Sequence, residues 1–152
     1  MNSVEKVIDF AEKSCKAHGA KLTTKRKNVL SGLLQSERAL SAYELIDLCR
    51  DQYGEALPAT SMYRILDFLQ QEHLIHRLHL ANKYIACAHI TCDHSHAVPQ
   101  FLICRECQKV KEISISTAVI SELKKNIEQA DFHLVSPQLE MNCLCEECVN
   151  RP

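Results

Sequence analysis

The spacing of hydrophobic residues in the first part of the chain predicts two amphipathic helices. Apolar residues recur from Val4 to about residue 18 with the period of one helix face. Gly19 follows, and glycine commonly ends a helix because it adopts the left-handed conformation without strain. Thr23 and Thr24 can then cap a second helix. The residues expected on the buried faces are Val4, Val7, Ile8, Ala11, Cys15, Val29, Leu30, Leu33 and Leu34.

Two further helices are expected between residues 41 and 72. Ser41 and Glu44 are spaced as in a capping box, in which each side chain satisfies a free backbone N–H group at the start of a helix. The fourth helix is expected to begin at Pro58, with Thr60 or Ser61 in its first turn. The residues that these two helices are expected to bury are Leu45, Ile46, Leu48, Cys49, Met62, Ile65, Leu66 and Leu69.

Residues 73–80 and 83–86 are short β-prone runs that predict a hairpin. Helices followed by a small hairpin predict a winged helix-turn-helix, whose last helix enters the major groove of DNA with its N-terminal residues foremost. Arg64 could then contact a guanine edge, and Tyr43 or Tyr63 could pack on a thymine methyl group or bind phosphate. The other candidate DNA-binding residues are Thr60, Ser61, Lys25 and Arg26. The alternative explanation for all of them is an exposed helix surface.

Beyond residue 99 the pattern changes to short strands around one helix. Residues 101–104, 110–115 and 132–141 are predicted strands, and Ser116 or Thr117 is expected to cap a helix between the last two. This helix is expected to bury Val119, Ile120, Leu123 and Ile127. A domain of this size buries little surface, so a bound metal and a second copy of the chain are expected to stabilise it.

Two Cys-x-x-Cys motifs supply a candidate metal site in this second domain. They are formed by Cys104 with Cys107 and by Cys145 with Cys148. Two intervening residues allow a tight turn to direct both sulfurs at one ion, and four thiolates complete the tetrahedral shell of a structural zinc site. Two pairs of buried cysteines without a metal are the alternative. The fold class is therefore α+β: a winged helix-turn-helix over residues 1–82, a hinge over 83–99, and a small α/β dimerisation and metal-binding domain over 100–152.

Composition and charge exclude several classes of protein. The chain has 152 residues, of which 46% are hydrophobic and 24% charged, with a net charge of −1. No run approaches the ~18 apolar residues of a membrane span, and the first residues lack a signal-peptide core. Nine cysteines are then expected to be metal ligands and reduced thiols of a cytoplasmic protein. The net charge favours no partner, but no acidic residue lies between Glu12 and Glu37, and this basic stretch could follow a phosphate backbone.

Motifs of common enzyme classes are absent from the sequence. Zinc deaminases combine His-x-Glu with Pro-Cys-x-x-Cys, whereas this chain has no His-x-Glu and no proline directly before Cys104. A thioredoxin-like enzyme would place one Cys-x-x-Cys in a βαβ pattern, which the helical first half does not provide. No P-loop, Rossmann glycine motif or Ser/His/Asp set is found. We therefore expect neither an enzyme nor a small-molecule substrate.

An ordered set of motifs resembles the ferric uptake regulator family, and most closely its zinc-sensing branch. The segments that carry the resemblance are residues 22–26 (LTTKR), 41–45 (SAYEL), 60–66 (TSMYRIL), 101–107 (FLICREC), 110–112 (VKE) and 145–148 (CEEC). They extend over nearly the whole chain. The resemblance implies a homodimeric, metal-dependent transcriptional repressor that binds double-stranded operator DNA to control zinc uptake genes. It implies two Zn²⁺ ions per subunit, one structural and one regulatory.

The resemblance also implies a regulatory zinc site made from His76, Cys87, His96 and Glu112. Two imidazoles, a thiolate and a carboxylate satisfy tetrahedral Zn²⁺, and the thiolate favours zinc over iron or manganese. His96 stands eight positions before Cys104 where the family pattern has seven, so His94 is an alternative ligand, and Cys92 and His89 are more remote ones. A wing histidine, a buried thiol and a surface carboxylate are the corresponding structural explanations.

The expected ligands come from the wing, the hinge and the dimerisation domain, so one ion would fix the orientation of the DNA-binding domain. A family member that senses iron or peroxide is one alternative, and a zinc-stabilised protein-interaction module without a DNA role is another. Cys87 argues against the former, and the basic stretch with the Tyr63–Arg64 face argues against the latter. Cys143 departs from the family pattern and is expected to be a spare buried cysteine, a competitor of Cys145 or a reactive thiol.

Overall fold

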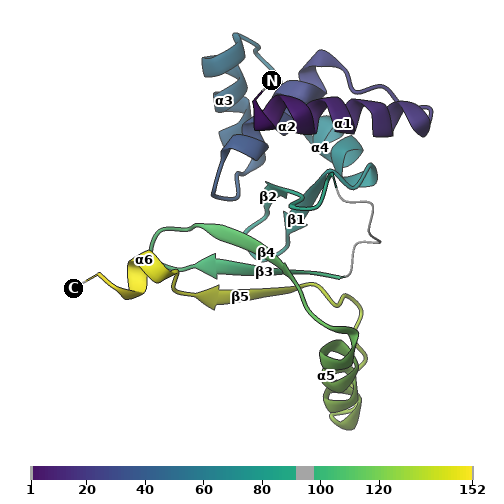
Figure 1. Cartoon of the computed structure of the whole chain (residues 1–152), viewed down its shortest axis with the longest axis vertical. Coiled ribbons are helices and arrows are strands. Elements are labelled where there is room, and N and C mark those ends of the chain that lie inside the picture. Colours follow the sequence, from purple (N-terminus) through teal and green to yellow (C-terminus); the bar gives the residue numbers. More distant parts are fainter. Residues whose placement is uncertain (1, 92–97, 152) are drawn as a thin grey trace. The chain divides into compact units, whose positions relative to one another are not determined.

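The first part of the chain folds into helices followed by a β-hairpin. The computed structural model describes residues 2–91 and 98–151, and the chain divides into two units, Met1–Asp93 and His94–Pro152. The elements of the first unit are α1 (Ser3–Ala17), α2 (Thr24–Gln35), α3 (Ala42–Tyr53), α4 (Ala59–Gln71), β1 (Ile75–Leu78) and β2 (Lys83–Ala86) (Figure 1). The helices and the hairpin predicted from the sequence are therefore confirmed.

Hydrogen bonds at the helix starts explain where these helices begin. Asn2 and Glu5 form a capping box on α1, and Ser41 and Glu44 form the predicted one on α3. Helix α4 differs, because its N-cap residue is Pro58, which makes no side-chain hydrogen bond, and its first turn contains no acidic residue. The free N–H groups in the first turn of α4 thus have no side-chain cap.

The helices of the first unit enclose a hydrophobic core. Its largest fully buried side chains include Leu30, Leu33, Leu45, Met62, Leu66, Leu69 and Leu78. Gly32 allows α2 to approach α3 closely, since a Cβ atom at this position would lie 2.8 Å from Leu48 Cδ2. A core built from several helices in this way stabilises the unit by burial of apolar surface.

The hairpin is attached to the helices by a short β-bridge. β1 and β2 are antiparallel, with His76 opposite Ile85. The backbone N–H of Leu40, which lies between α2 and α3, donates to the Tyr84 carbonyl at 2.9 Å, and Tyr84 returns the bond at 2.8 Å. Helices α3 and α4 with this attached hairpin form a winged helix-turn-helix.

The second unit contains a sheet with the strand order β4-β3-β5 (Figure 1). β3 (Pro99–Cys104) pairs antiparallel with β4 (Val110–Ser114) and parallel with β5 (Leu139–Cys143). Between β4 and β5 the chain passes through α5 (Thr117–Gln129), and it ends in the short helix α6 (Glu146–Val149). Helices α5 and α6 lie toward opposite ends of the sheet (Figure 1).

A buried glutamine connects β3 to the chain that enters β5. Gln100 is fully buried, and its Nε2 atom donates to the Pro137 carbonyl at 2.9 Å. Its Oε1 atom accepts a hydrogen bond from the Leu139 backbone N–H at 2.7 Å. One side chain therefore satisfies two backbone groups where the β5 pairing begins, and this fixes the register of β5.

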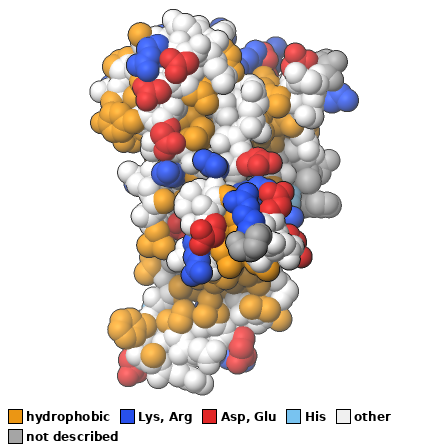
Figure 2. Space-filling model, turned by 90° about the vertical axis from the view of Figure 1, so that its left-hand side faces the viewer, with side chains coloured by type: hydrophobic (Ala, Val, Ile, Leu, Met, Phe, Trp, Pro, Cys, Tyr) orange, Lys and Arg blue, Asp and Glu red, His pale blue; other side chains and the backbone are white. Residues whose placement is uncertain are grey.

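Two expectations for the second unit need correction. The strand predicted over residues 132–141 begins only at Leu139, because β3 offers β5 partners from Gln100 to Cys104, and Val135 is 97% exposed. Helix α5 buries none of its residues within the described chain, and Val119 is 55% exposed. Hydrophobic side chains are visible on the lower part of the molecule, where α5 lies (Figure 2). No described helix is long and apolar enough to cross a membrane.

Replacement of Gln100 by alanine tests the role of this side chain. We expect Gln100→Ala to lower the free energy of unfolding of the second unit by about 1–3 kcal/mol, because the Pro137 carbonyl and the Leu139 N–H, both on half-buried residues, lose their hydrogen-bond partner. Denaturant unfolding followed by circular dichroism measures the change. Gln129→Ala, at an exposed position of α5, should change the same free energy by less than about 0.5 kcal/mol. Equal losses in the two variants would contradict the assigned role.

Candidate metal centres and nucleic-acid interface

The structure brings together the four cysteines of the two Cys-x-x-Cys motifs. Cys104 ends β3, Cys107 lies in the turn before β4, Cys145 is the N-cap residue of α6, and Cys148 lies within α6. Their Sγ atoms all lie within 4.8 Å of one another. The cluster is thus formed inside the second unit.

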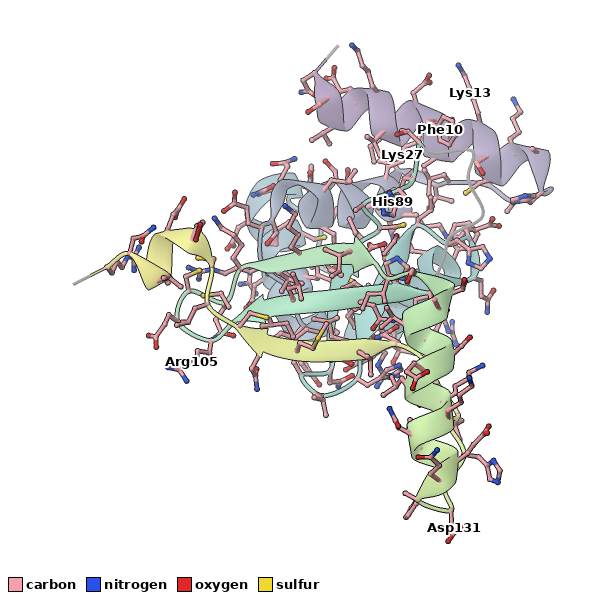
Figure 3. The ribbon with its side chains drawn as sticks, turned by 60° about the horizontal axis from the view of Figure 1, so that its bottom comes forward. Phe10, Lys13, Lys27, His89, Arg105 and Asp131 are labelled. Carbon is pink, nitrogen blue, oxygen red and sulfur yellow. The ribbon has the colours of Figure 1, made fainter. Side chains whose placement is uncertain are left out.

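Backbone geometry explains how each motif folds. In the first, Gln108 adopts a left-handed conformation (φ 67°), and its N–H donates to the Cys104 carbonyl at 2.9 Å. In the second, the Cys148 N–H donates to the Cys145 carbonyl at 3.0 Å in the first turn of α6. The Cys145 N–H also donates to Cys104 Sγ at 3.4 Å, which links the two motifs directly. Arg105 points away from the sheet (Figure 3).

The spacing of the sulfurs suits a tetrahedral zinc ion. Four sulfurs held about 2.3 Å from one zinc ion lie about 3.8 Å apart. The Sγ atoms of Cys107 and Cys145 are 3.7 Å apart, much too far for a disulfide bond. All four cysteines are free thiols. The donor set and its spacing make this cluster a candidate structural zinc site.

The thiols of the cluster differ in their tendency to ionise. Backbone hydrogen bonds at Cys107 and Cys145 lower the pKa of the Cys104 thiol to about 6. A hydrogen bond to the Cys145 side chain, together with burial, raises the pKa of the Cys148 thiol to about 12. Neighbouring thiolates repel one another, and a divalent cation among them would favour the ionised form of the whole cluster.

A second candidate group lies in the wing of the first unit. His76 is in β1 and Cys87 directly follows β2, and their ligand atoms lie within 4.8 Å of each other. Cys87 is buried, its backbone N–H donates to the Leu74 carbonyl at 2.9 Å, and its Sγ accepts from the His89 N–H at 3.4 Å. An imidazole and a thiol held in one place are two of the four ligands expected for the regulatory site.

The other expected regulatory ligands belong to the second unit or lie outside the described residues. Glu112 is in β4, opposite Phe101 of β3. His96 and the alternative ligands His94 and Cys92 lie outside the described residues. The remaining alternative, His89, is described, but it is not a member of the group that contains His76 and Cys87.

The predicted DNA-binding residues of α3 and α4 are accessible to solvent. Tyr43 is 65% exposed in the first turn of α3, and Tyr63 is 37% exposed. Thr60 and Arg64 are exposed as well, while Ser61 is half-buried. These α4 residues lie near its N-terminus, which has no side-chain cap and no acidic residue in its first turn. The absence of acidic residues after Pro58 was a sequence signal for an anion-binding helix end that the motif analysis missed.

The basic stretch on α1 and α2 is partly neutralised within the fold. Lys13 pairs with Asp9 at 3.1 Å, and Lys27 pairs with Glu12 beside α1 (Figure 3). Lys25, in contrast, is exposed in the first turn of α2.

Arg26 is held in place by contacts within the first unit. Its guanidinium carbon lies 3.7 Å from the centroid of the Phe68 ring, and its Nη1 atom donates to the Lys21 carbonyl at 2.6 Å. These contacts fix the link between the start of α2 and α4. Among the predicted basic contacts, Lys25 is therefore more accessible to a DNA backbone than Arg26.

A winged helix-turn-helix joined to an α/β unit with a four-cysteine cluster defines a DNA-binding fold that carries a candidate metal site. The sequence profile of the Ferric uptake regulator family matches residues 17–142. The chain belongs to this family.

Individual relatives agree with this assignment. The Zinc uptake regulation protein of Escherichia coli (strain K12) is 32% identical over 147 residues, which cover 97% of this chain and 84% of the relative. The Ferric uptake regulation protein of Helicobacter pylori (strain ATCC 700392 / 26695) is 26% identical over 151 residues, covering 97% and 95%.

Solved structures show the same fold. A zinc uptake regulator complexed with zinc and DNA has a TM-score of 0.82 at 28% identity, covering 98% of this chain and 97% of that one. Holo XcZur has a TM-score of 0.76 at 31% identity, covering 95% and 97%.

Proposed function

We propose that the chain is a zinc-responsive transcriptional repressor that binds operator DNA as a zinc-loaded homodimer and controls zinc uptake genes. The observation that carries this proposal is the pair His76 and Cys87 in the wing of a DNA-binding fold, because it joins a zinc-preferring donor set to the unit that holds α4. The similarity to the E. coli zinc uptake regulation protein and to a zinc uptake regulator solved with zinc and DNA supports it. Binding of operator DNA would place the protein in the cytoplasm.

The structural zinc ion would be held by Cys104, Cys107, Cys145 and Cys148. Zinc bound to four thiolates supplies a cross-link that needs no redox chemistry. In this unit the link would join the end of β3 to α6, which are separated by some forty residues of intervening chain.

The regulatory zinc ion would be held by His76, Cys87, Glu112 and a histidine, His96 or His94. Its proposed ligands belong to both units, so a bound ion would limit the orientations that the DNA-binding unit takes relative to the second unit. A coupling free energy of about 1–3 kcal/mol is typical of such linkage. The two ions would give two Zn²⁺ per subunit. Sensing of iron is the alternative, since ferric uptake regulators are also relatives, and the Cys87 thiol disfavours it.

The proposed DNA contact is made by the N-terminal part of α4. Tyr63 and Arg64 are exposed there, and the uncapped N–H groups after Pro58 favour the approach of a phosphate. Tyr43 and Lys25 lie in the first turns of α3 and α2, where they could contact the backbone of the same groove.

The proposed homodimer would use the second unit. Helix α5 buries no residue within the described chain, and Phe132, just beyond it, is 71% exposed. An amphipathic helix of this kind needs an apolar partner, and a second copy supplies one by symmetry. Two copies would also present two α4 helices to a palindromic site.

Replacement of Cys87 tests the regulatory site. We expect Cys87→Ala to abolish zinc-dependent DNA binding while the dimer stays folded, because the variant loses one ligand of the regulatory ion and none of the structural ion. A gel shift against candidate promoter fragments, with zinc, iron or chelator in parallel, measures the effect. Cys49→Ala removes another buried thiol of the first unit and should leave zinc dependence intact. A Cys87→Ala protein that still bound DNA only with added zinc would show that the assignment is wrong.

Replacement of Cys148 should have a different effect. We expect Cys148→Ala to lose one zinc ion per chain and to dissociate or unfold the second unit, because three thiolates cannot close the tetrahedral site. Elemental analysis and sedimentation measure the two effects. Cys143→Ala should keep the full zinc content, since Cys143 is not among the four clustered thiols. Full zinc content in Cys148→Ala would contradict the proposed structural site.

Two side chains should contribute to DNA binding in different ways. Arg64→Ala should weaken binding of the specific operator by about 10- to 100-fold, as expected for the loss of a bidentate base contact. Lys25→Ala should weaken binding to all sequences and reduce the salt slope by about one. Titrations at several salt concentrations separate the two effects. Lys124→Ala removes the same charge from α5 and should alter neither. An unchanged operator affinity in Arg64→Ala would exclude it from the interface.

A further inference from the structure

A fifth cysteine stands beside the four-cysteine cluster without belonging to it. Cys143 ends β5 and is the in-register partner of Cys104 at the end of β3. The Arg105 N–H donates to the Cys143 carbonyl at 3.0 Å, which fixes the two strand ends together. Cys143 is half-buried, whereas Cys104 is 3% exposed.

The two thiols face one cavity. In-register residues of neighbouring parallel strands project to the same face of a sheet. Cys104 and Cys143 accordingly both line a cavity of about 320 Å³, together with Leu102, Leu144 and Cys145. A cavity of this size admits a small hydroperoxide, and its wall contains a thiol outside the proposed zinc ligands.

We propose that Cys143 is an oxidation site that forms a disulfide bond with Cys104, and this inference rests on the proposed structural zinc site. Neighbouring strands are about 4.8 Å apart, which lies within the Cα–Cα range of about 4.4–6.8 Å for disulfides. Cys143 has its sulfur free for reaction, whereas Cys104 would share its lone pair with the metal. The half-buried thiol therefore reacts first, and its buried neighbour resolves the product.

The chemistry balances with a hydroperoxide as the oxidant. The Cys143 thiolate attacks the distal peroxide oxygen, the O–O bond breaks, and the products are a sulfenic acid and an alcohol, or water from hydrogen peroxide. The Cys104 sulfur then attacks the Cys143 sulfur, an S–S bond forms, and the hydroxyl group leaves as water after taking up a proton. Two electrons pass from the two thiols to the peroxide. Loss of Cys104 from the donor set leaves three thiols, so zinc affinity falls.

The test uses the zinc-loaded full chain exposed to hydrogen peroxide. Zinc release is followed with a colorimetric chelator, and disulfides are mapped by mass spectrometry after alkylation. We expect a peptide pair joined through Cys104 and Cys143, and zinc release about tenfold slower in Cys143→Ala than in the unaltered protein. The matched control Cys49→Ala, which removes a buried thiol of the first unit, should release zinc as the unaltered protein does.

Two results would overturn the oxidation site. One is equal zinc release from Cys143→Ala and the unaltered protein. The other is a disulfide confined to Cys107 and Cys145, whose sulfurs are 3.7 Å apart. Zinc content measured before peroxide is added separates a failure of the oxidation site from a failure of the structural zinc site. If the protein contains its full zinc but peroxide yields no Cys104–Cys143 disulfide, the oxidation site alone is wrong. If the protein binds no zinc even at saturating zinc concentration, the structural zinc site is wrong as well.

Discussion

The closure of the two Cys-x-x-Cys turns on each other is the constraint on which the second unit depends. Among the described residues of this unit, those fully or nearly fully buried are Gln100, Phe101 and Cys104. So small an interior contributes little burial free energy, and short strands add little to it. A metal ion bound by four thiolates binds the folded unit and not the unfolded chain, so the metal-binding free energy becomes folding free energy. Gln100 sets the register at the opposite end of β5, so the cysteine cluster holds one end of the sheet and the Gln100 hydrogen bonds hold the other.

In the first unit, burial of apolar surface contributes more to stability than a metal ion would. Its helices bury a set of large side chains, among them Leu30, Leu45, Met62 and Leu66, so burial of apolar surface is the main contribution to its stability. His76 and Cys87 lie at the wing of this unit and not in its helical interior. We therefore expect that a metal ion bound there would dissociate without unfolding the helices. A zinc ion would therefore be structural in the second unit and regulatory in the first, because the two units differ in how much apolar surface they bury.

Local signals made most of the first unit predictable from the sequence. The capping box of Ser41 and Glu44 and the period of the apolar residues depend on neighbours in the chain, and both predictions are confirmed. The predicted start of β5 was wrong because the length of a parallel strand depends on hydrogen bonds to a partner strand, here about forty residues away in the sequence. Arg26 was predicted to be a DNA contact, but its stacking on Phe68 could not be read from the sequence, since the two residues are brought together only by packing. Spacing identified the four clustered cysteines, whereas the regulatory ligands came only from the family resemblance.

The net charge of −1 shows why a DNA-binding role must be argued from local charge. Helices α1 and α3 place Glu5 and Glu44 in their first turns, where a carboxylate satisfies free N–H groups. The carboxylate of Glu5 repels phosphate, whereas the charge of Glu44 is offset by Lys83 at 3.3 Å, so Tyr43 in the same turn stays accessible to a phosphate. Helices α2 and α4 have no acidic residue there, and α2 adds the exposed Lys25. Phosphate is attracted over about one Debye length, some 8 Å at physiological salt, so the helix ends nearest the ligand outweigh distant acidic residues. The positions of a few carboxylates and of the lysines that pair with them, and not the net charge, therefore determine the local potential at each helix end.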